Sequence, residues 1–187
     1  MTETMQANRR SQHITIVSET FPPEINGVAN TLRQLCQGLM QRGHRVTVIR
    51  PRQQHERKGH FASAGEALFS REHVVTGLPL PGYADLRFGL ARTSHLKKLL
   101  TTDRPDAVYV ATQGPLGVAA TTAARQIGIP VSSGFHTNFH SYSRYYGVGM
   151  LERLLCLYGR WFHNRTAITL VPTRKMQQTT RAMGIPA

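Results

Sequence analysis

The sequence predicts an α/β fold built on a doubly wound, mostly parallel sheet with helices on both faces. The main observation is an alternation along the chain. Short apolar runs rich in β-branched residues are followed by amphipathic segments of helical period, which is the order typical of parallel β–α–β units. The second observation is size, because 187 residues with 40% hydrophobic content can bury the core that such a sheet needs.

The first β–α–β unit contains the most informative loop. A buried strand at 14–18 is followed by a loop at 19–27, then by a helix that begins near Val28 and stops at Gly43, and then by a strand at 44–49. Apolar residues recur on one face of this helix, and glycine commonly ends a helix. In such a unit the helix N-terminus points at the carboxyl end of the first strand, where backbone N–H groups favour an anion. The loop therefore suggests a nucleotide or phosphate site.

The other elements continue the alternation. Residues 1–12 are polar and are expected to form a disordered lead-in, so that the domain proper covers 13–187. A turn is expected at 78–82, where two prolines and a glycine gather. Further strands are predicted at 73–77, 106–111, 130–135 and 167–171, and further helices at 91–100, 115–127, 138–165 and 174–183. The helix at 138–165 is expected to turn these residues inward: Met150, Leu151, Leu154, Leu155, Tyr158, Trp161 and Phe162.

Cysteine usage and hydropathy indicate a cytoplasmic protein. Cys36 and Cys156 lie far apart at apolar helix positions, and we expect both to be buried thiols in a reducing compartment. The N-terminus lacks the apolar stretch of a secretory signal. No apolar run approaches the roughly 18–20 residues that a membrane-spanning helix needs.

The charge is strongly positive, at +13. A field of that sign attracts nucleic acid, anionic lipid headgroups and nucleotide phosphates alike. The segment Leu86–Leu100 mixes leucines with basic residues and fits either an interfacial helix or a core-packed helix with a solvated basic side. After Asp106 the only acidic residue is Glu152, against eight basic residues: Arg125, Arg144, Arg153, Arg160, Arg165, Arg174, Lys175 and Arg181.

The loop at Asn26 and Gly27 is the first candidate site. It lacks the Gly-x-Gly-x-x-Gly fingerprint, and the following strand ends in Arg50 rather than in an acidic residue that could hold a ribose. These departures argue against a dinucleotide-dependent dehydrogenase. The local sequence leaves two readings open, a phosphate site or a turn that simply caps the helix.

The second candidate is His136, which follows the strand predicted at 130–135. A histidine at the carboxyl edge of a parallel sheet can donate to a sugar hydroxyl or exchange a proton near neutral pH. His136 and His140 have the i, i+4 spacing of zinc ligands, but Thr137 stands where a zincin needs glutamate, so no metal is expected. The alternative is that both histidines only make hydrogen bonds at a strand–helix corner.

Four stretches together carry a resemblance to a known family. They are Glu19-Thr20-Phe21-Pro22-Pro23 with Asn26-Gly27-Val28; Arg42-Gly43-His44-Arg45-Val46; Arg104-Pro105-Asp106; and Phe135-His136-Thr137-Asn138-Phe139. With these motifs the chain resembles the N-terminal domain of the family 4 retaining glycosyltransferases, which have the GT-B architecture of two Rossmann-like halves. The stretch through Tyr142, Arg144, Tyr145, Tyr146 and Gly147 resembles most the branch of mannosyltransferases and sulfolipid or galactolipid synthases.

The resemblance implies roles for residues on the donor side of the site. Gly27 would let the loop backbone approach the diphosphate of a nucleotide-sugar donor, with Glu19 and Asn26 shaping the same loop. His136 would lie beside the transferred sugar, where it would orient the sugar and stabilise developing charge. The donor would be UDP- or GDP-linked, and no metal or other cofactor would be required of this half.

The resemblance also implies roles on the acceptor side and for the whole protein. Tyr142 and Arg144 would line the acceptor site. The chain would be the acceptor-side half of a hexosyltransferase acting on a lipid or glycan, peripheral at the cytoplasmic membrane face. Its donor-binding C-terminal domain would be absent from these 187 residues, leaving the isolated half inactive. The alternatives are a non-catalytic basic module that binds polyanions and a phosphate-binding hydrolase.

Overall fold

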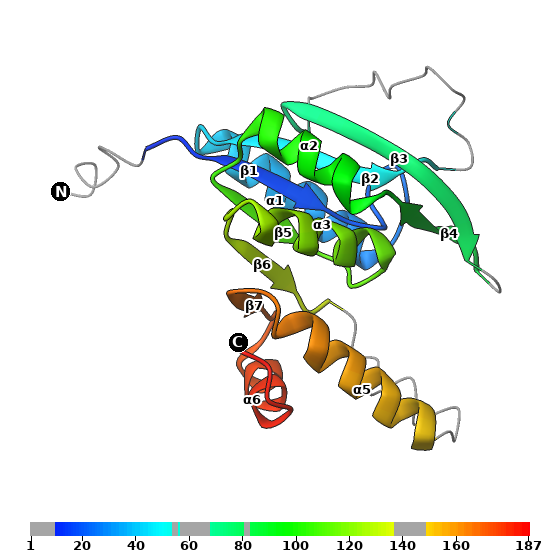
Figure 1. Ribbon diagram of the computed structural model, residues 1–187. Helices are drawn as coiled ribbons and strands as arrows, with labels where there is room; N and C mark the ends of the chain where they lie inside the picture. Colours follow the sequence, from blue (N-terminus) through cyan, green and yellow to red (C-terminus); the bar gives the residue numbers. More distant parts are fainter. Residues whose placement is uncertain (1–9, 54–55, 57–67, 81–82, 137–148) are drawn as a thin grey trace.

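The computed structural model describes residues 10–53, 56, 68–80, 83–136 and 149–187. They form a seven-stranded sheet with helices on both faces (Figure 1), which confirms the predicted Rossmann-like α/β class. The strands are β1 (His13–Val17), β2 (Arg45–Pro51), β3 (Arg71–Leu80), β4 (Tyr83–Leu90), β5 (Ala107–Val110), β6 (Val131–Gly134) and β7 (Ile168–Leu170). The helices are α1 (Gly27–Gln41), α2 (Thr93–Asp103), α3 (Pro115–Gln126), α5 (Gly149–His163) and α6 (Arg174–Ala182).

The strand order is β4-β3-β2-β1-β5-β6-β7. Every neighbouring pair is parallel except β3 and β4, which run antiparallel. The chain therefore winds outward from β1 to one side and returns to wind outward from β5 to the other. This arrangement is doubly wound, and its switch point lies between β1 and β5.

The two faces of the sheet hold separate hydrophobic clusters. On one face α1 places Leu32 and Cys36 against Ile16 of β1 and Val48 of β2. On the other face α2 and α3 pack on alternate residues of the same strands, such as Val17. Figure 1 shows α2 and α3 on the near side of the sheet and α1 behind it. The period of two along each strand thus divides its side chains between the two layers.

The ends of α1 follow the local chemistry that the sequence predicts. Asn26 caps the N-terminus, because its Oδ1 accepts from the Ala29 N–H at 2.8 Å. After the last turn the chain enters Gly43, whose φ of +79° favours glycine, and the Gly43 N–H donates to the Met40 carbonyl at 2.9 Å. β1 covers His13–Val17, one residue earlier at each end than the predicted strand at 14–18, and residues 1–9 of the expected lead-in lie outside the described residues.

The hairpin of β3 and β4 corrects the prediction for the middle of the chain. β3 extends beyond the predicted 73–77, and Leu86–Leu90, expected to belong to an interfacial or core-packed helix, is strand that pairs with β3. The helical part of that segment starts only at Thr93. The prediction was wrong because Leu86, Phe88 and Leu90 alternate with a strand period of two, while the leucines of α2 have a helical period. The register shifts between Pro79 and Leu80, an irregularity at which a proline fits in a strand.

The helix α5 falls within the predicted 138–165, of which residues 138–148 lie outside the described part. Phe162 is 1% exposed and packs in the α2/α3 cluster, as expected. Leu154, Tyr158 and Trp161 are instead exposed, so the prediction that they face inward was wrong. Apolar residues cover more than one face of α5, and the sheet contacts only one of these faces. No helix among the described residues is long and apolar enough to cross a bilayer.

The two cysteines differ in burial. Cys36 is fully buried in the α1 cluster, as predicted. Cys156 is only half-buried, because it lies at the margin of the α5 face that packs inward, which corrects the expectation that both thiols are buried.

Candidate functional site

The candidate site lies at the carboxyl edge of the sheet, beside the switch point. β1, β5 and β6 are parallel neighbours, so the loops that follow them gather at one edge. These loops hold Glu19, Asn26 and Gly27 after β1, residues 111–114 after β5, and His136 after β6. The topology thus brings together the candidates that lie more than a hundred residues apart in the chain.

A network of polar side chains fixes the loop after β1. The Nδ2 of Asn26 donates to the Thr20 hydroxyl at 2.6 Å, and Thr20 in turn donates to the Glu24 carboxylate. The Oδ1 of Asn26 is the cap of α1, so the helix-cap reading of this residue is correct. Gly27 is exposed, and a Cβ added there would meet no atom within 4 Å. The loop therefore presents an open helix N-terminus held in a fixed conformation.

Glu19 points inward and makes hydrogen bonds to α3, to β4 and to the loop after β5. Its Oε1 accepts from the Leu116 N–H at 2.9 Å in the first turn of α3, and its Oε2 accepts from the Gly89 N–H of β4. Its own N–H donates to the Thr112 hydroxyl at 2.7 Å. A side chain at Gly114 would collide with the carboxylate. Burial raises the pKa of Glu19 to about 7, although the backbone donors act in the opposite direction.

His136 lies beside Tyr109 of β5. The Tyr109 hydroxyl oxygen is 2.6 Å from the His136 Nε2, and the two rings meet edge to face. A side chain at Gly134 would collide with both groups, so this close approach requires glycine there. Burial lowers the pKa of His136 and raises that of Tyr109 to about 12. Near neutral pH the pair is therefore a neutral imidazole against a protonated phenol.

The loop after β1 and the His136–Tyr109 pair share one face of the sheet. Tyr109 belongs to the cluster that α1 covers, together with Phe21 of the loop and Leu32 of α1. His136, through its contact with Tyr109, lies on that same side. Two of the predicted site residues, Tyr142 and Arg144, lie outside the described residues, as does His140. In the described part of the chain no three His, Cys, Asp or Glu side chains are grouped so that they could hold a metal ion.

A buried polar cluster under β6 is a feature that the sequence analysis missed. The Nε2 of His163 lies 3.1 Å from the Gln113 Oε1, and its Nδ1 lies 2.9 Å from the Ser133 hydroxyl. Because an amide oxygen only accepts, Nε2 carries the proton and Nδ1 accepts from Ser133. Tyr158 of α5 donates to the Gln113 carbonyl. The cluster thus fastens α5 to the loop after β5, and the wide sequence separation of its members leaves no local signal.

Arg50, which stands where a dinucleotide enzyme would have an acid, is also engaged internally. It is almost fully buried at the end of β2. Its guanidinium donates to Glu72 at 2.6 Å and to Glu56 at 2.8 Å. Its charge is thereby neutralised within the protein, so Arg50 contributes little to the positive field at the edge.

Comparison with known proteins gives the family of this chain. The model of Glycosyltransferase Family 4 matches residues 25–187. The chain belongs to glycosyltransferase family 4. It is 30% identical over 173 residues to a GDP-mannose-dependent alpha-mannosyltransferase of Mycolicibacterium smegmatis, covering 92% of this chain and 45% of the relative. It is 25% identical over 144 residues to the alpha-monoglucosyldiacylglycerol synthase of Streptococcus pneumoniae, covering 75% of this chain and 30% of the relative.

The chain thus spans less than half the length of these two relatives. It matches their N-terminal portion, which confirms the predicted mannosyltransferase and lipid glycosyltransferase branch. Among solved structures, S. aureus MnaA with UDP superposes with a TM-score of 0.57 at 16% identity, over 92% of this chain and 42% of that one. The UDP-GlcNAc 2-epimerase of Methanocaldococcus jannaschii gives 0.54 at 15% identity, over 92% and 43%. At such identities the likeness shows the fold alone, a Rossmann-like half.

Proposed function

We propose that this protein is the acceptor-side half of a retaining glycosyltransferase that transfers a hexose from a UDP- or GDP-linked donor to a lipid or glycan acceptor. The transfer would take place at the cytoplasmic face of the membrane. Membership of glycosyltransferase family 4 supports the reaction class, and two names among the relatives support the substrate classes. One is GDP-mannose-dependent, and another makes a glucosyl diacylglycerol.

The observation that carries the proposal is the placement of His136. It lies with Tyr109 at the carboxyl edge of the sheet, on the same face as the open N-terminus of α1. A sugar diphosphate has a hydroxyl-rich part and a doubly charged part joined to each other. An imidazole that can hydrogen-bond to a sugar hydroxyl and a helix N-terminus that can bind a phosphate, both at this edge, match those two parts.

The protonation of the pair suggests how His136 would act. The high pKa of Tyr109 keeps its proton on the phenol, which can donate to the His136 Nε2. The imidazole then carries its own proton on Nδ1, which makes no hydrogen bond to the described residues and can donate to a sugar hydroxyl. Because burial lowers its pKa, His136 stays neutral and adds no positive charge of its own to the sugar site. Its role is to orient the sugar and to stabilise charge that develops in the transition state.

The backbone at Gly27 would bind the diphosphate of the donor. Its exposed position leaves the backbone of the first turn of α1 open to a phosphate, and the helix dipole there favours negative charge. Asn26 and Glu19 would act indirectly, because the side chains of both are engaged in holding the loops. We propose that this half needs no metal for that binding.

The test is transfer by the full-length gene product. UDP-, GDP- and ADP-linked sugars are offered with a total lipid extract in the presence of a chelator, and wild type is compared with His136→Ala and Tyr109→Phe. We expect transfer from one donor class, a loss of about 100-fold or more in kcat for His136→Ala, and a smaller loss for Tyr109→Phe. Turnover that is unchanged in His136→Ala would contradict the assignment of His136, and no turnover with any donor would contradict the function.

The charge favours a second candidate, a non-catalytic module that binds polyanions. The eight basic residues and the single glutamate after Asp106 leave that half of the chain at +7. Binding to nucleic acid with a steep salt dependence, without binding to nucleotide or lipid, would favour this alternative. Titration of the protein with a labelled duplex and with UDP and GDP, at low and at high salt, separates the two.

A further inference from the structure

An exposed apolar stripe follows the outer side of α5. Leu154 is 57% exposed, Leu157 62%, Tyr158 37% and Trp161 46%. Their spacing of i, i+3, i+4 and i+7 places them on one side of the helix. Phe162, which is 1% exposed, belongs to the other side, where α5 packs on the sheet. The helix therefore has two apolar faces, and only one of them packs against the rest of the described residues.

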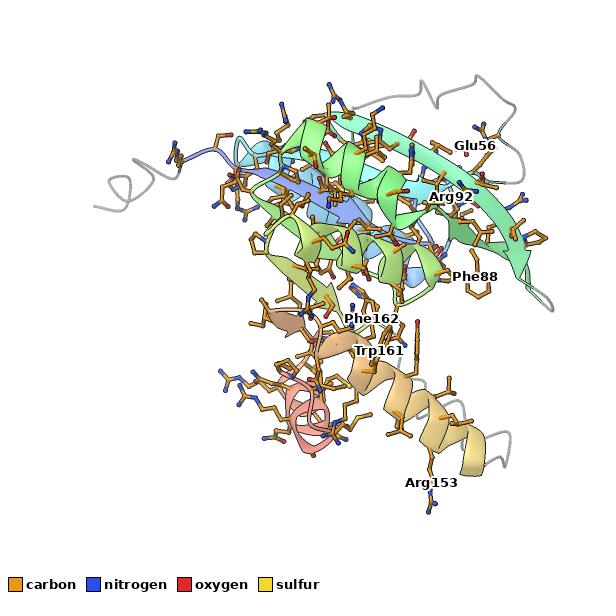
Figure 2. All side chains as sticks on the ribbon, viewed as in Figure 1. Glu56, Phe88, Arg92, Arg153, Trp161 and Phe162 are labelled. Atoms are coloured by element: carbon orange, nitrogen blue, oxygen red, sulfur yellow. The ribbon has the colours of Figure 1, made fainter. Side chains whose placement is uncertain are left out.

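The other helices that the structure describes leave this stripe uncovered. In Figure 1, α5 extends from the carboxyl end of the sheet away from α2 and α3. Figure 2 shows Trp161 and Phe162 near the sheet and Arg153 near the far end, pointing away from the body of the molecule. The ring of Trp161 stacks on Tyr158 with centroids 5.8 Å apart, and the Arg165 guanidinium lies 5.0 Å from its centroid. These contacts hold the large rings at the surface.

Positive charge accompanies the stripe. Arg153 and Arg160 are both exposed, and their separation of seven residues places them along one border of the stripe. The surrounding half of the chain, from Ala107 onward, carries the +7 noted above. Leucines and a tryptophan bordered by arginines form the pattern of a helix that lies in the plane of a membrane interface, where the apolar face enters the acyl boundary. Arginines at such a border can extend to lipid phosphates.

The stripe also adjoins the candidate site. Tyr158 donates to the Gln113 carbonyl, which lies in the loop after β5 at the carboxyl edge. Gln113 directly follows Thr112, the residue that accepts the Glu19 N–H. A surface that rests on the stripe is therefore close to the edge at which His136 stands. This adjacency matters because a lipid acceptor would have to leave such a surface to reach that edge.

We infer that the outer face of α5 is the surface by which this protein docks on an anionic bilayer, with Leu154, Leu157 and Trp161 entering the interface and Arg153 and Arg160 contacting lipid phosphates. This inference deepens the proposed function and rests on its lipid acceptor. In this inference α5, and not Leu86–Leu100, is the segment that contacts the membrane. Charge complementarity favours an anionic bilayer over a second copy of the chain, because a symmetric contact would bring Arg153 and Arg160 of one copy toward the same arginines of the other.

The experiment measures binding of the full-length protein to phosphatidylcholine vesicles with and without phosphatidylglycerol. Two variants remove the components of the face separately, Leu154→Ser/Leu157→Ser and Arg153→Gln/Arg160→Gln. Matched controls are Leu78→Ser, another exposed leucine, and Lys97→Gln/Lys98→Gln, which removes two exposed charges from α2. All seven side chains changed in these variants and controls are exposed, and thermal unfolding checks that each protein is folded.

We expect wild type and both controls to bind the anionic vesicles and to bind the neutral ones more weakly. The arginine variant should bind the anionic vesicles about 30-fold more weakly, at about 1 kcal/mol for each arginine near an anionic surface. The leucine variant should bind the anionic vesicles about tenfold more weakly, or weaker still. Both variants should retain wild-type turnover on detergent-dispersed acceptor and lose it on vesicle-borne acceptor.

Equal binding of wild type to neutral and anionic vesicles would overturn the inference, as would variants of the face that bind like the controls. A change in oligomeric state in the leucine variant, with vesicle binding unaltered, would assign the face to a second copy of the chain and also overturn it. Absence of turnover with detergent-dispersed acceptor in wild type would count against the proposed function and not against the vesicle result. The two failures are therefore distinguishable.

Discussion

Acidification should destabilise this protein through His163. The side chain is 0% exposed, lies between the rings of Phe135 and Phe162, and makes its two hydrogen bonds to neutral groups. Burial lowers its pKa from 6.5 to about 4. Between these values the unfolded chain binds a proton that the folded protein excludes, so the free energy of unfolding falls as the pH falls. At about 1.4 kcal/mol per pH unit, the full loss amounts to about 3 kcal/mol.

Urea unfolding followed by circular dichroism, for wild type and His163→Gln, measures this loss. Glutamine keeps a neutral polar side chain that takes up no proton. The variant should therefore be less stable than wild type near neutral pH. As the pH falls toward about 4, the free energy of unfolding of wild type should fall by about 3 kcal/mol relative to that of the variant. The other histidines are the same in both proteins, so their contributions to stability cancel in the difference. A difference that is constant with pH, or an imidazole of His163 that titrates by NMR near its ordinary pKa, would refute the reasoning.

Three further substitutions test other parts of the fold by thermal or urea unfolding. Asn26→Ala should cost about 1 kcal/mol because α1 loses its cap, whereas Asn26→Asp should keep it; equal losses would contradict the capping role. Glu19→Ala should cost about 2–4 kcal/mol, since two backbone N–H groups lose their acceptor. With the pKa of Glu19 raised to about 7, the folded protein holds the extra proton, so wild-type stability should fall relative to the variant as the pH rises from about 4.5 to 7. Phe162→Ala should cost about 3–5 kcal/mol and the exposed Trp161→Ala under about 1, and similar losses would show that α5 is packed differently.

The parts of the fold that could be predicted are those whose signal is local. The period of α1, its end at Gly43 and the proline at the start of α3 each depend on residues within one or two turns of each other. β4 could not be separated from α2 because their apolar residues run together without a glycine–proline break between Leu90 and Thr93. The alternation of three residues at 86–90 is a weak signal by itself, and the pairing with β3 in the hairpin establishes that this part is strand.

The residues of the candidate site could likewise be predicted only where their signal is local. His136 could be found because it directly follows an apolar strand, but its partner Tyr109 looked like one more aromatic core residue. Tyr109 has a polar tip near the carboxyl end of its strand, and that position is the signal that could have pointed to it. The contacts of Glu19 with Gly89 and Leu116 depend on how three distant elements meet, which no periodicity in the chain encodes.

The inward carboxylate of Glu19 makes the two helix N-termini at this edge unequal. The dipole of α3 already faces a carboxylate from the protein itself, whereas α1 is capped by the neutral amide of Asn26. A diphosphate lying across the edge would meet attraction at α1 and like charge toward α3 whenever Glu19 is ionised. The chain thereby imposes a polarity on the edge, so that the orientation of a charged ligand is constrained before any contact with its sugar or its base is made.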